Sequence, residues 1–429
     1  MSNCLTLRVL ITVLALIPMG ACATLDRQAA VPSDRRLDAK VLDFPNARFF
    51  TDQPAQISAE HERSLVREAK HLGIREGMLP KANFLSLSGG GDDGAFGAGL
   101  LVGWTKHGDR PKFKLVTGTS VGALIAPFAF LGSDYDSALT DLFTNLDPSK
   151  VFEKRFITAA ITDDAMADTS PLFDTISRYV DDRMIASIAQ EYANGRLLFI
   201  QTTDLDAGRP VIWNIGAIAA TGRIDGRRLI RRILLASASI PGAFPPIMFN
   251  VDVDGRPYQE MHVDGSTVSQ GFLYPPTVSV TASDSATGFQ KQRIAYIIWN
   301  SRPHTDWEEV ERKTIDVAAK AVSTMISYNG AGDLLPMYLT ARRDGVAFNL
   351  AYVGDDFTVE HKVEFDQSYM RALYDYGYKL GVAGYKWKNR PAGFIEKPSQ
   401  TAFRATLDSQ AKLIASNPAK ARAYMHPYY

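Results

Sequence analysis

Short apolar runs alternate with amphipathic or apolar helical stretches along most of the chain. The runs that read as buried strands are Asn83–Ser88, Phe113–Thr117, Leu197–Thr203, Ile294–Trp299 and a short one, Met261–Val263. Helices are expected over Ser58–Leu72, Ala95–Lys106 and Val121–Leu131. This alternation predicts an α/β fold with a mostly parallel central sheet sandwiched by helices. In such sheets the ligand site lies beyond the carboxyl ends of the strands.

The N-terminus has the pattern of an export signal. Arg8 precedes an apolar run of eleven residues, Val9–Met19, which is too short for a bilayer span of about 20. The segment Met19-Gly20-Ala21-Cys22 resembles a bacterial lipobox, in which the cysteine is lipidated and becomes the first residue of the mature protein. The alternative is an ordinary signal peptide with a chance cysteine. Because Ala23 rather than Asp follows, the resemblance implies anchoring at the cell envelope in the outer membrane.

Composition limits the classes of protein that remain. Of 429 residues, 46% are hydrophobic and 22% charged, so the chain can bury a sizeable core. Lys plus Arg equals Asp plus Glu at 47 each, which provides no general field for nucleic acid, and we expect no nucleic-acid partner. The two cysteines, Cys4 and Cys22, both precede the folded body, which therefore has no disulfide and no cysteine metal site.

These features divide the chain into four segments. We predict a lipoprotein signal peptide over 1–21, a tether and N-terminal helical lead-in over 22–78, a catalytic core over 79–275, and a C-terminal α/β extension packed on the core over 276–429.

A G-x-S-x-G pentapeptide follows the strand Phe113–Thr117 and precedes an apolar helix. It comprises Gly118, Thr119, Ser120, Val121 and Gly122. This is the context of a nucleophile elbow, whose tight turn needs glycines because the backbone doubles back with no room for Cβ atoms. The helix start behind Ser120 offers unpaired N–H groups and a positive dipole end, which favour a developing oxyanion.

A glycine-rich loop, SGGGDDG, follows the first strand. Consecutive glycines can aim successive N–H groups at one anion. The spacing of Gly89, Gly91 and Gly94 also fits a dinucleotide-binding loop, but Asp92 and Asp93 would repel a pyrophosphate. A plain turn is the third alternative. The pentapeptide that follows in the same sheet favours an oxyanion hole.

The third motif is Val263-Asp264-Gly265-Ser266, at the end of the short strand. An Asp-Gly pair alone is usually a turn. Together, however, the glycine loop, the Ser120 pentapeptide and Asp264 resemble in order and setting the patatin-like phospholipase family, from about Phe84 to Gly265. The segment Ala236–Pro246 (ASASIPGAFPP) also looks like one that these proteins carry between nucleophile and Asp.

The resemblance implies a lipid acyl hydrolase of the phospholipase A or esterase type, with a lipid or phospholipid ester as substrate and no cofactor. The matching positions are Ser120 as nucleophile, Asp264 as its base, Gly89, Gly90 and Gly91 as the oxyanion hole, and Gly118 and Gly122 as the elbow glycines.

Two positions depart from the family pattern. Asp93 stands where the family often has Arg or Lys, so a positive charge near the hole is missing. Ser266 stands where Gly or Ala is usual. An inactive patatin-like surface lipoprotein that binds lipid or a protein partner therefore stays open as an alternative.

Two arguments bear on which residue is the base: the pKa of Asp264 and the positions of the histidines. A carboxylate near its reference pKa of about 4 is a poor base, so we expect burial to raise the pKa of Asp264. His262 shares its strand face and could be a third member, although a packed histidine is the favoured interpretation. The other six histidines lack a strand-end setting, which favours a Ser–Asp dyad over the triad of α/β-hydrolase lipases. No cluster has metal-ligand spacing, so we expect no metal.

Two segments are candidates for substrate access, 147–170 and Ile240–Phe249. The second is apolar and proline-rich, which suits the entrance of an acyl chain. An ordinary connecting loop is the alternative for both.

Overall fold

The computed structural model describes residues 27–145, 149, 151, 153–154, 167–302, 309–361, 363, 365–391 and 394. The predicted signal peptide, Cys22 and most of the segment 147–170 lie outside these residues, so the expectations for them stay predictions. The described residues up to Asn389 belong to one compact unit, and those from Arg390 onward belong to a second. The description below concerns the first unit.

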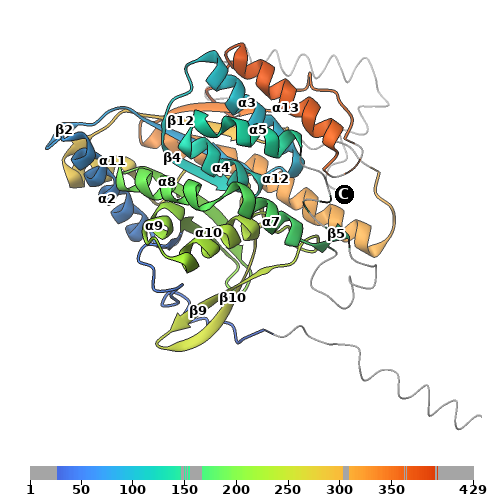
Figure 1. Ribbon diagram of the computed structural model, residues 1–429, viewed down its shortest axis with the longest axis horizontal. Coiled ribbons are helices and arrows are strands. Elements are labelled where there is room, and N and C mark those ends of the chain that lie inside the picture. The colour runs from blue at the N-terminus through green and yellow to red at the C-terminus, as the bar shows by residue number, and fades with distance from the viewer. Residues whose placement is uncertain are drawn as a thin grey trace, which may run out of the picture. The chain divides into compact units, whose positions relative to one another are not determined.

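A nine-stranded sheet crosses the described part of this unit (Figure 1). Its order is β1-β8-β7-β4-β3-β12-β13, and β10 pairs with both β7 and β9. The strands are β1 (Arg48–Phe50), β3 (Ala82–Leu87), β4 (Phe113–Thr119), β7 (Leu197–Asp204), β8 (Arg209–Asn214), β9 (Ile247–Val253), β10 (Arg256–Asp264), β12 (Arg293–Trp299) and β13 (Ala347–Tyr352). Two small sheets pair β2 (Gly77–Met78) with β11 (Phe289–Gln290) and β5 (Glu153–Lys154) with β6 (Ala167–Asp168).

Five neighbouring strands of the large sheet, from β7 through β4, β3 and β12 to β13, run parallel. The strands β8 and β10 are antiparallel to β7. Every residue of β4 and β7 is buried, which is typical of parallel strands that are covered on both faces. The predicted α/β class with a mostly parallel sheet is confirmed.

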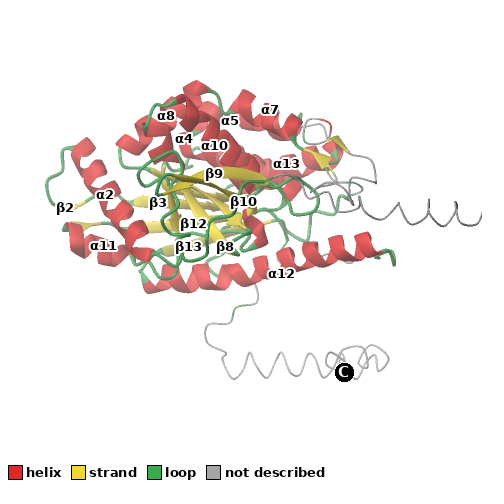
Figure 2. Ribbon diagram, turned by 90° about the horizontal axis from the view of Figure 1, so that it is seen from below, coloured by secondary structure: helices red, strands yellow, loops and turns green. Residues whose placement is uncertain are grey.

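Helices cover both faces of this sheet. Figure 2 shows α4, α8 and α10 on one side and the long α12 on the other. The helices are α2 (Pro54–Leu72), α3 (Gly94–His107), α4 (Val121–Leu131), α5 (Asp136–Thr144), α7 (Ser170–Tyr179), α8 (Asp182–Ala193), α9 (Ile215–Ala220), α10 (Ile224–Ser237), α11 (Val280–Thr287), α12 (Thr314–Arg343) and α13 (Gln367–Val382), with short 3-10 turns η1 (Gly91–Asp93), η2 (Ser133–Tyr135) and η4 (Gly265–Thr267). No helix in the described ranges is long and apolar enough to cross a membrane.

The helices α3 and α13 pack backbone to backbone through glycines. A Cβ atom at Gly99 would lie 2.0 Å from the carbonyl oxygen of Tyr374, and one at Gly377 would lie 2.4 Å from that of Phe96. This close approach places α13 against the helix that begins at the glycine loop.

The large sheet collects strands from three of the four predicted segments. The strand β1 comes from the lead-in, and β12 and β13 come from the C-terminal extension. The predicted boundaries themselves stay a prediction.

The strand that ends at Asp264 is longer than the sequence indicated. It begins at Arg256 instead of Met261 and forms a hairpin with β9. The hairpin turn is Asp254-Gly255, with φ values of 52° and 79°, which is the type I′ geometry that favours Asp-Gly. Because β10 is antiparallel to β7 and pairs Asp264 with Thr202, it approaches the carboxyl edge of the parallel strands from outside.

Candidate active site

Ser120 lies in the turn between β4 and α4. Its backbone has φ 54° and ψ −127°, a costly conformation for a residue with a side chain. A Cβ atom at Gly118 would lie 2.5 Å from the Gly122 carbonyl oxygen, and one at Gly122 would lie 2.3 Å from that of Leu87. The two glycines are therefore required by close backbone approach, as predicted for a nucleophile elbow.

The Ser120 hydroxyl meets the carboxyl group of Asp264. Ser120 Oγ donates to Asp264 Oδ2 at 2.6 Å, and both side chains are buried. The other carboxyl oxygen accepts the N–H of Ser266 at 2.7 Å. Burial raises the pKa of Asp264 to about 6, although the hydrogen bonds from Ser120 and Ser266 oppose the rise. This is the direction expected for a carboxyl group that must accept a proton.

The end of α10 and the residues just after it bind the backbone of both Ser120 and Asp264. The N–H of Ser120 donates to Ser237 Oγ at 3.0 Å, and the N–H of Asp264 donates to the carbonyl oxygen of Ser239 at 2.8 Å. Ser237 Oγ in turn donates to the carbonyl oxygen of Gln201. The sequence pointed to this ASAS segment only by resemblance, and its role of fixing the distance between Ser120 and Asp264 was not foreseen.

The glycine loop runs beside Ser120. A Cβ atom at Gly89 would lie 3.2 Å from Ser120 Cβ, and one at Gly90 would lie 1.9 Å from the carbonyl oxygen of Asn300. Gly90 and Gly91 have φ values of 151° and 57°, which suit glycine. The loop can pass this close to the serine only without side chains.

The three loop glycines are not equivalent as donors. The N–H of Gly89 donates to the carbonyl oxygen of Gln270 at 2.8 Å and is therefore already used. Among the hydrogen bonds of the described residues, none uses the N–H of Gly90 or Gly91. The N–H groups of Gly90 and Gly91 are thus available to an oxyanion, whereas that of Gly89 anchors the loop. The oxyanion hole itself stays a prediction.

The two loop aspartates face the later part of the chain. Asp92 accepts hydrogen bonds from His361 Nε2 at 2.7 Å and from the N–H of Phe365 at 2.8 Å. Asp93 accepts from the hydroxyl of Tyr369 at 2.6 Å, and burial raises its pKa to about 6. Asp93 therefore replaces the expected positive charge with a carboxyl group that ties the loop to α13.

An apolar pocket opens next to Ser120. Its lining comprises Gly91, Asp92, Ser120, Val121, Leu124, Leu142, Phe143, Val151, Leu172, Ala238, Ile240, Phe244, Phe365 and Met370. Most of these side chains are aliphatic or aromatic, and α4, α5, α7 and α13 contribute six of the fourteen residues. Ile240 and Phe244 come from the apolar segment in which the sequence suggested an acyl-chain entrance.

His262 belongs to a different network. It is fully buried, with Nε2 at 3.3 Å from Glu260 and Nδ1 at 2.8 Å from Thr202 Oγ1. Across the described residues, no histidine hydrogen-bonds Ser120 or Asp264. Burial alone would raise the pKa of Glu260, but the Arg48 charge and His262 lower it to about 2. His262 is therefore a packed histidine in an ion-pair network.

Among the described residues, the side chains whose spacing could hold a metal ion belong to the same network. Ligand atoms of Asp204, Glu260 and His262 lie within 4.8 Å of one another, and all three residues are buried. The sequence missed this cluster because Asp204 comes from another strand. The guanidinium of Arg48 pairs with Glu260 and supplies the positive charge that a metal would bring, so the donors do not fit a cation.

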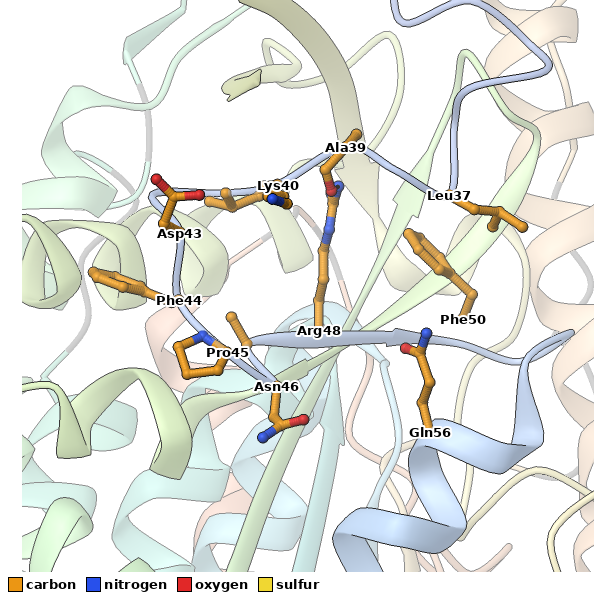
Figure 3. Close-up of a pocket in the computed structure, with 12 residues that line it drawn as sticks. Leu37, Ala39, Lys40, Asp43, Phe44, Pro45, Asn46, Arg48, Phe50 and Gln56 are labelled. Carbon is orange, nitrogen blue, oxygen red and sulfur yellow. Dashed lines mark hydrogen bonds between the residues drawn. The ribbon is translucent and has the colours of Figure 1, made fainter. Parts of the chain in front are cut away.

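A second pocket lies in the N-terminal lead-in, apart from these residues. It is lined by residues between Leu37 and Gln56. Figure 3 shows Arg48 rising from β1 between Phe44 and Phe50. None of the predicted site residues contributes to it.

Comparisons with known proteins identify the middle of the chain. Residues 85–274 match the family model described as patatin-like phospholipase, and this part of the chain is therefore a patatin-like phospholipase domain. All three motifs lie within it. A search of curated proteins found no match. Among solved structures, the crystal structure of VipD from Legionella pneumophila is similar, with 10% identity over 78% of this chain and 75% of that chain and a TM-score of 0.36.

Proposed function

We propose that this patatin-like domain is a serine lipid acyl hydrolase of the phospholipase A or esterase type, which cleaves carboxylic esters through a dyad of Ser120 and Asp264. The observation that carries the proposal is the 2.6 Å hydrogen bond between the Ser120 hydroxyl and the buried Asp264 carboxyl group. It occurs at a strained turn, next to a loop with two unused N–H groups.

The geometry supports one sequence of steps. Ionised Asp264 accepts the hydroxyl proton while Ser120 Oγ attacks the ester carbonyl carbon. The resulting oxyanion is held by the N–H groups of Gly90 and Gly91, and removing one such donor typically costs about 3–4 kcal/mol of transition-state stabilisation. As the C–O bond to the leaving group breaks, Asp264 gives its proton to that oxygen, and the neutral alcohol departs. A water molecule then attacks the acyl-Ser120 ester and gives a proton to Asp264, which returns it to Ser120 Oγ as the carboxylic acid is released.

The acidity of Asp264 suits this role. A base works best when its pKa lies near the working pH. With a pKa of about 6, Asp264 is ionised at neutral pH and is a stronger base than an ordinary carboxylate. The absence of a histidine partner among the described residues is consistent with a dyad.

The apolar pocket indicates the substrate. Leu124, Phe143 and Met370 line it next to Ser120, and such a surface favours an acyl chain over a polar acyl group because burial removes apolar area from water. We therefore assign this pocket to the acyl chain of a lipid or phospholipid ester.

The dyad is tested on purified protein from residue 23 onward, with p-nitrophenyl esters of several chain lengths and with phospholipid vesicles. We expect Ser120→Ala and Asp264→Asn each to lower kcat/KM by roughly 10³-fold or more. Asp204→Asn is the matched control, because Asp204 is a buried carboxyl group on the neighbouring strand that does not touch Ser120.

Three outcomes separate the alternatives. Loss in the two dyad variants with activity in the control supports the proposal. An active Asp264→Asn enzyme together with an inactive His262→Ala enzyme would instead indicate a triad that contains a histidine. A wild-type protein that hydrolyses neither esters nor vesicles would indicate a binding protein that has lost catalysis.

A further inference from the structure

The segment that follows Asp264 connects the candidate base to the glycine loop. It runs from Gly265 to Phe272 along the carboxyl edge of the sheet. The carbonyl oxygen of Gln270, near its end, accepts the N–H of Gly89 at 2.8 Å. This segment therefore holds the start of the glycine loop next to Ser120, while Asp92 and Asp93 hold its other end.

Side chains hold the segment from two directions. On the sheet side, Gln201 Nε2 donates to the carbonyl oxygens of Gly265 and Ser269 at 3.1 and 3.0 Å. On the other side, Asp333 of α12 accepts the N–H of Gln270 at 2.7 Å. A hydrogen bond from the Gly271 N–H to the same carboxyl group also lowers the pKa of Asp333.

The helix α12 approaches the segment closely at this point. A Cβ atom at Gly330 would lie only 2.3 Å from Oε1 of Gln270, so the missing side chain lets Gln270 pack against the helix. Gln270 is buried, and Asp333 lies one helical turn beyond Gly330. A backbone N–H in such a place needs an acceptor, because leaving it unpaired costs about 1–3 kcal/mol.

We propose that Asp333 is a positioning residue for the hydrolase reaction. It fixes the Gln270 peptide, through it the N–H of Gly89, and so the aim of the Gly90 and Gly91 donors at the oxyanion on Ser120. The inference rests on the proposed function, because it assigns those donors a task. Asp333 lies about 60 residues beyond the patatin-like match (residue 333 against 274), so the C-terminal extension contributes to the site.

Steady-state kinetics distinguish a residue that positions the Gly90 and Gly91 donors from one that only stabilises the fold. At pH 8, above the pKa of about 7 to which burial raises Asp333, this side chain is a carboxylate. We expect Asp333→Asn to lower kcat about tenfold or more on a short-chain ester while KM changes less than about twofold, because misplaced donors lose transition-state binding selectively.

Asp344→Asn is the matched control. Asp344, just after the last residue of α12, also accepts a backbone N–H, that of Val280, but it does not contact the segment 265–272. It should lower the melting temperature and leave kcat unchanged. An Asp333→Asn enzyme with wild-type kcat, or equal losses of kcat in both variants, would overturn the proposal.

A second measurement does not depend on turnover. Amide hydrogen exchange of peptides that cover residues 84–97 should be faster in Asp333→Asn than in the wild-type protein and unchanged in Asp344→Asn. If the wild-type protein hydrolyses no ester, the proposed function fails, yet the exchange result still decides whether Asp333 holds the loop. Equal exchange in all three proteins would show that it does not.

Discussion

Two residues of the candidate site hold states that cost free energy. Ser120 has a positive φ, which costs on the order of 1–3 kcal/mol for a residue with a side chain. Asp264 is a buried carboxyl group, and the causes of its pKa shift include no cation. Each state is maintained by neighbours on other elements, since Ser237 and Ser239 bind the backbone N–H groups of the two residues. Costs of this kind concentrate where chemistry needs them.

The raised pKa of Asp264 predicts the pH dependence of hydrolysis. Because the base must be ionised, kcat/KM should fall about tenfold per pH unit below pH 6 and level off above it. The stability change has the opposite sign: a folded pKa above the unfolded value of about 4 gives stability that is present at pH 4 and lost as the pH rises through 6. A pH series of kcat/KM, paired with thermal unfolding, measures both.

Asp93 provides the control for this assignment, because burial raises its pKa to about 6 as well. The Asp93→Asn enzyme should keep the midpoint of the rate profile near pH 6, whatever its maximal rate. A midpoint that disappears in this variant would assign the titration to the loop rather than to the base.

At the scale of elements, local patterns found the site and missed what surrounds it. The strands β3 and β4 and the helices after them were predicted within one or two residues, because each is a continuous apolar run next to glycines. The hairpin of β9 and β10 was missed although Asp254-Gly255 is the turn signal for it, because polar residues interrupt its strands. Its register with β7 then places Asp264 opposite Thr202, which no local pattern reveals.

The segment Ile240–Phe249 supplies an element whose role can be tested. Phe244 is buried in the apolar pocket, so Phe244→Asp should lower kcat/KM more for long-chain than for short-chain p-nitrophenyl esters, with the ratio changing roughly tenfold or more. Ile247→Asp is the control, since Ile247 belongs to the same segment but does not line the pocket. An equal loss on long and short esters in Phe244→Asp would remove the pocket from the acyl-binding role.

At the scale of the whole molecule, the sequence identifies the reacting groups but not the residues that hold them in place. Ser120, Asp264 and the loop glycines sit in contiguous motifs whose composition is unusual. Gln201 and Asp333 are single polar residues in a strand and a helix, and no motif marks either of them as part of a site. They act only because the sheet and α12 place them on the segment after Asp264. Contacts between elements far apart in the sequence therefore place the residues of the site that motifs cannot predict.

The attachment of the protein to a membrane is a prediction for the whole chain. Lys plus Arg equals Asp plus Glu, so no net charge attracts the protein to anionic lipid, and we propose that lipidated Cys22 anchors it at the cell envelope. In a bacterial host the wild-type protein should incorporate labelled palmitate. It should also sediment with membranes, because each buried CH₂ of the acyl chains contributes about 0.8 kcal/mol. Cys22→Ser should become soluble with unchanged activity on a soluble ester, and Cys4→Ser should stay on the membrane. A membrane-bound Cys22→Ser protein would show that another part of the chain provides the attachment.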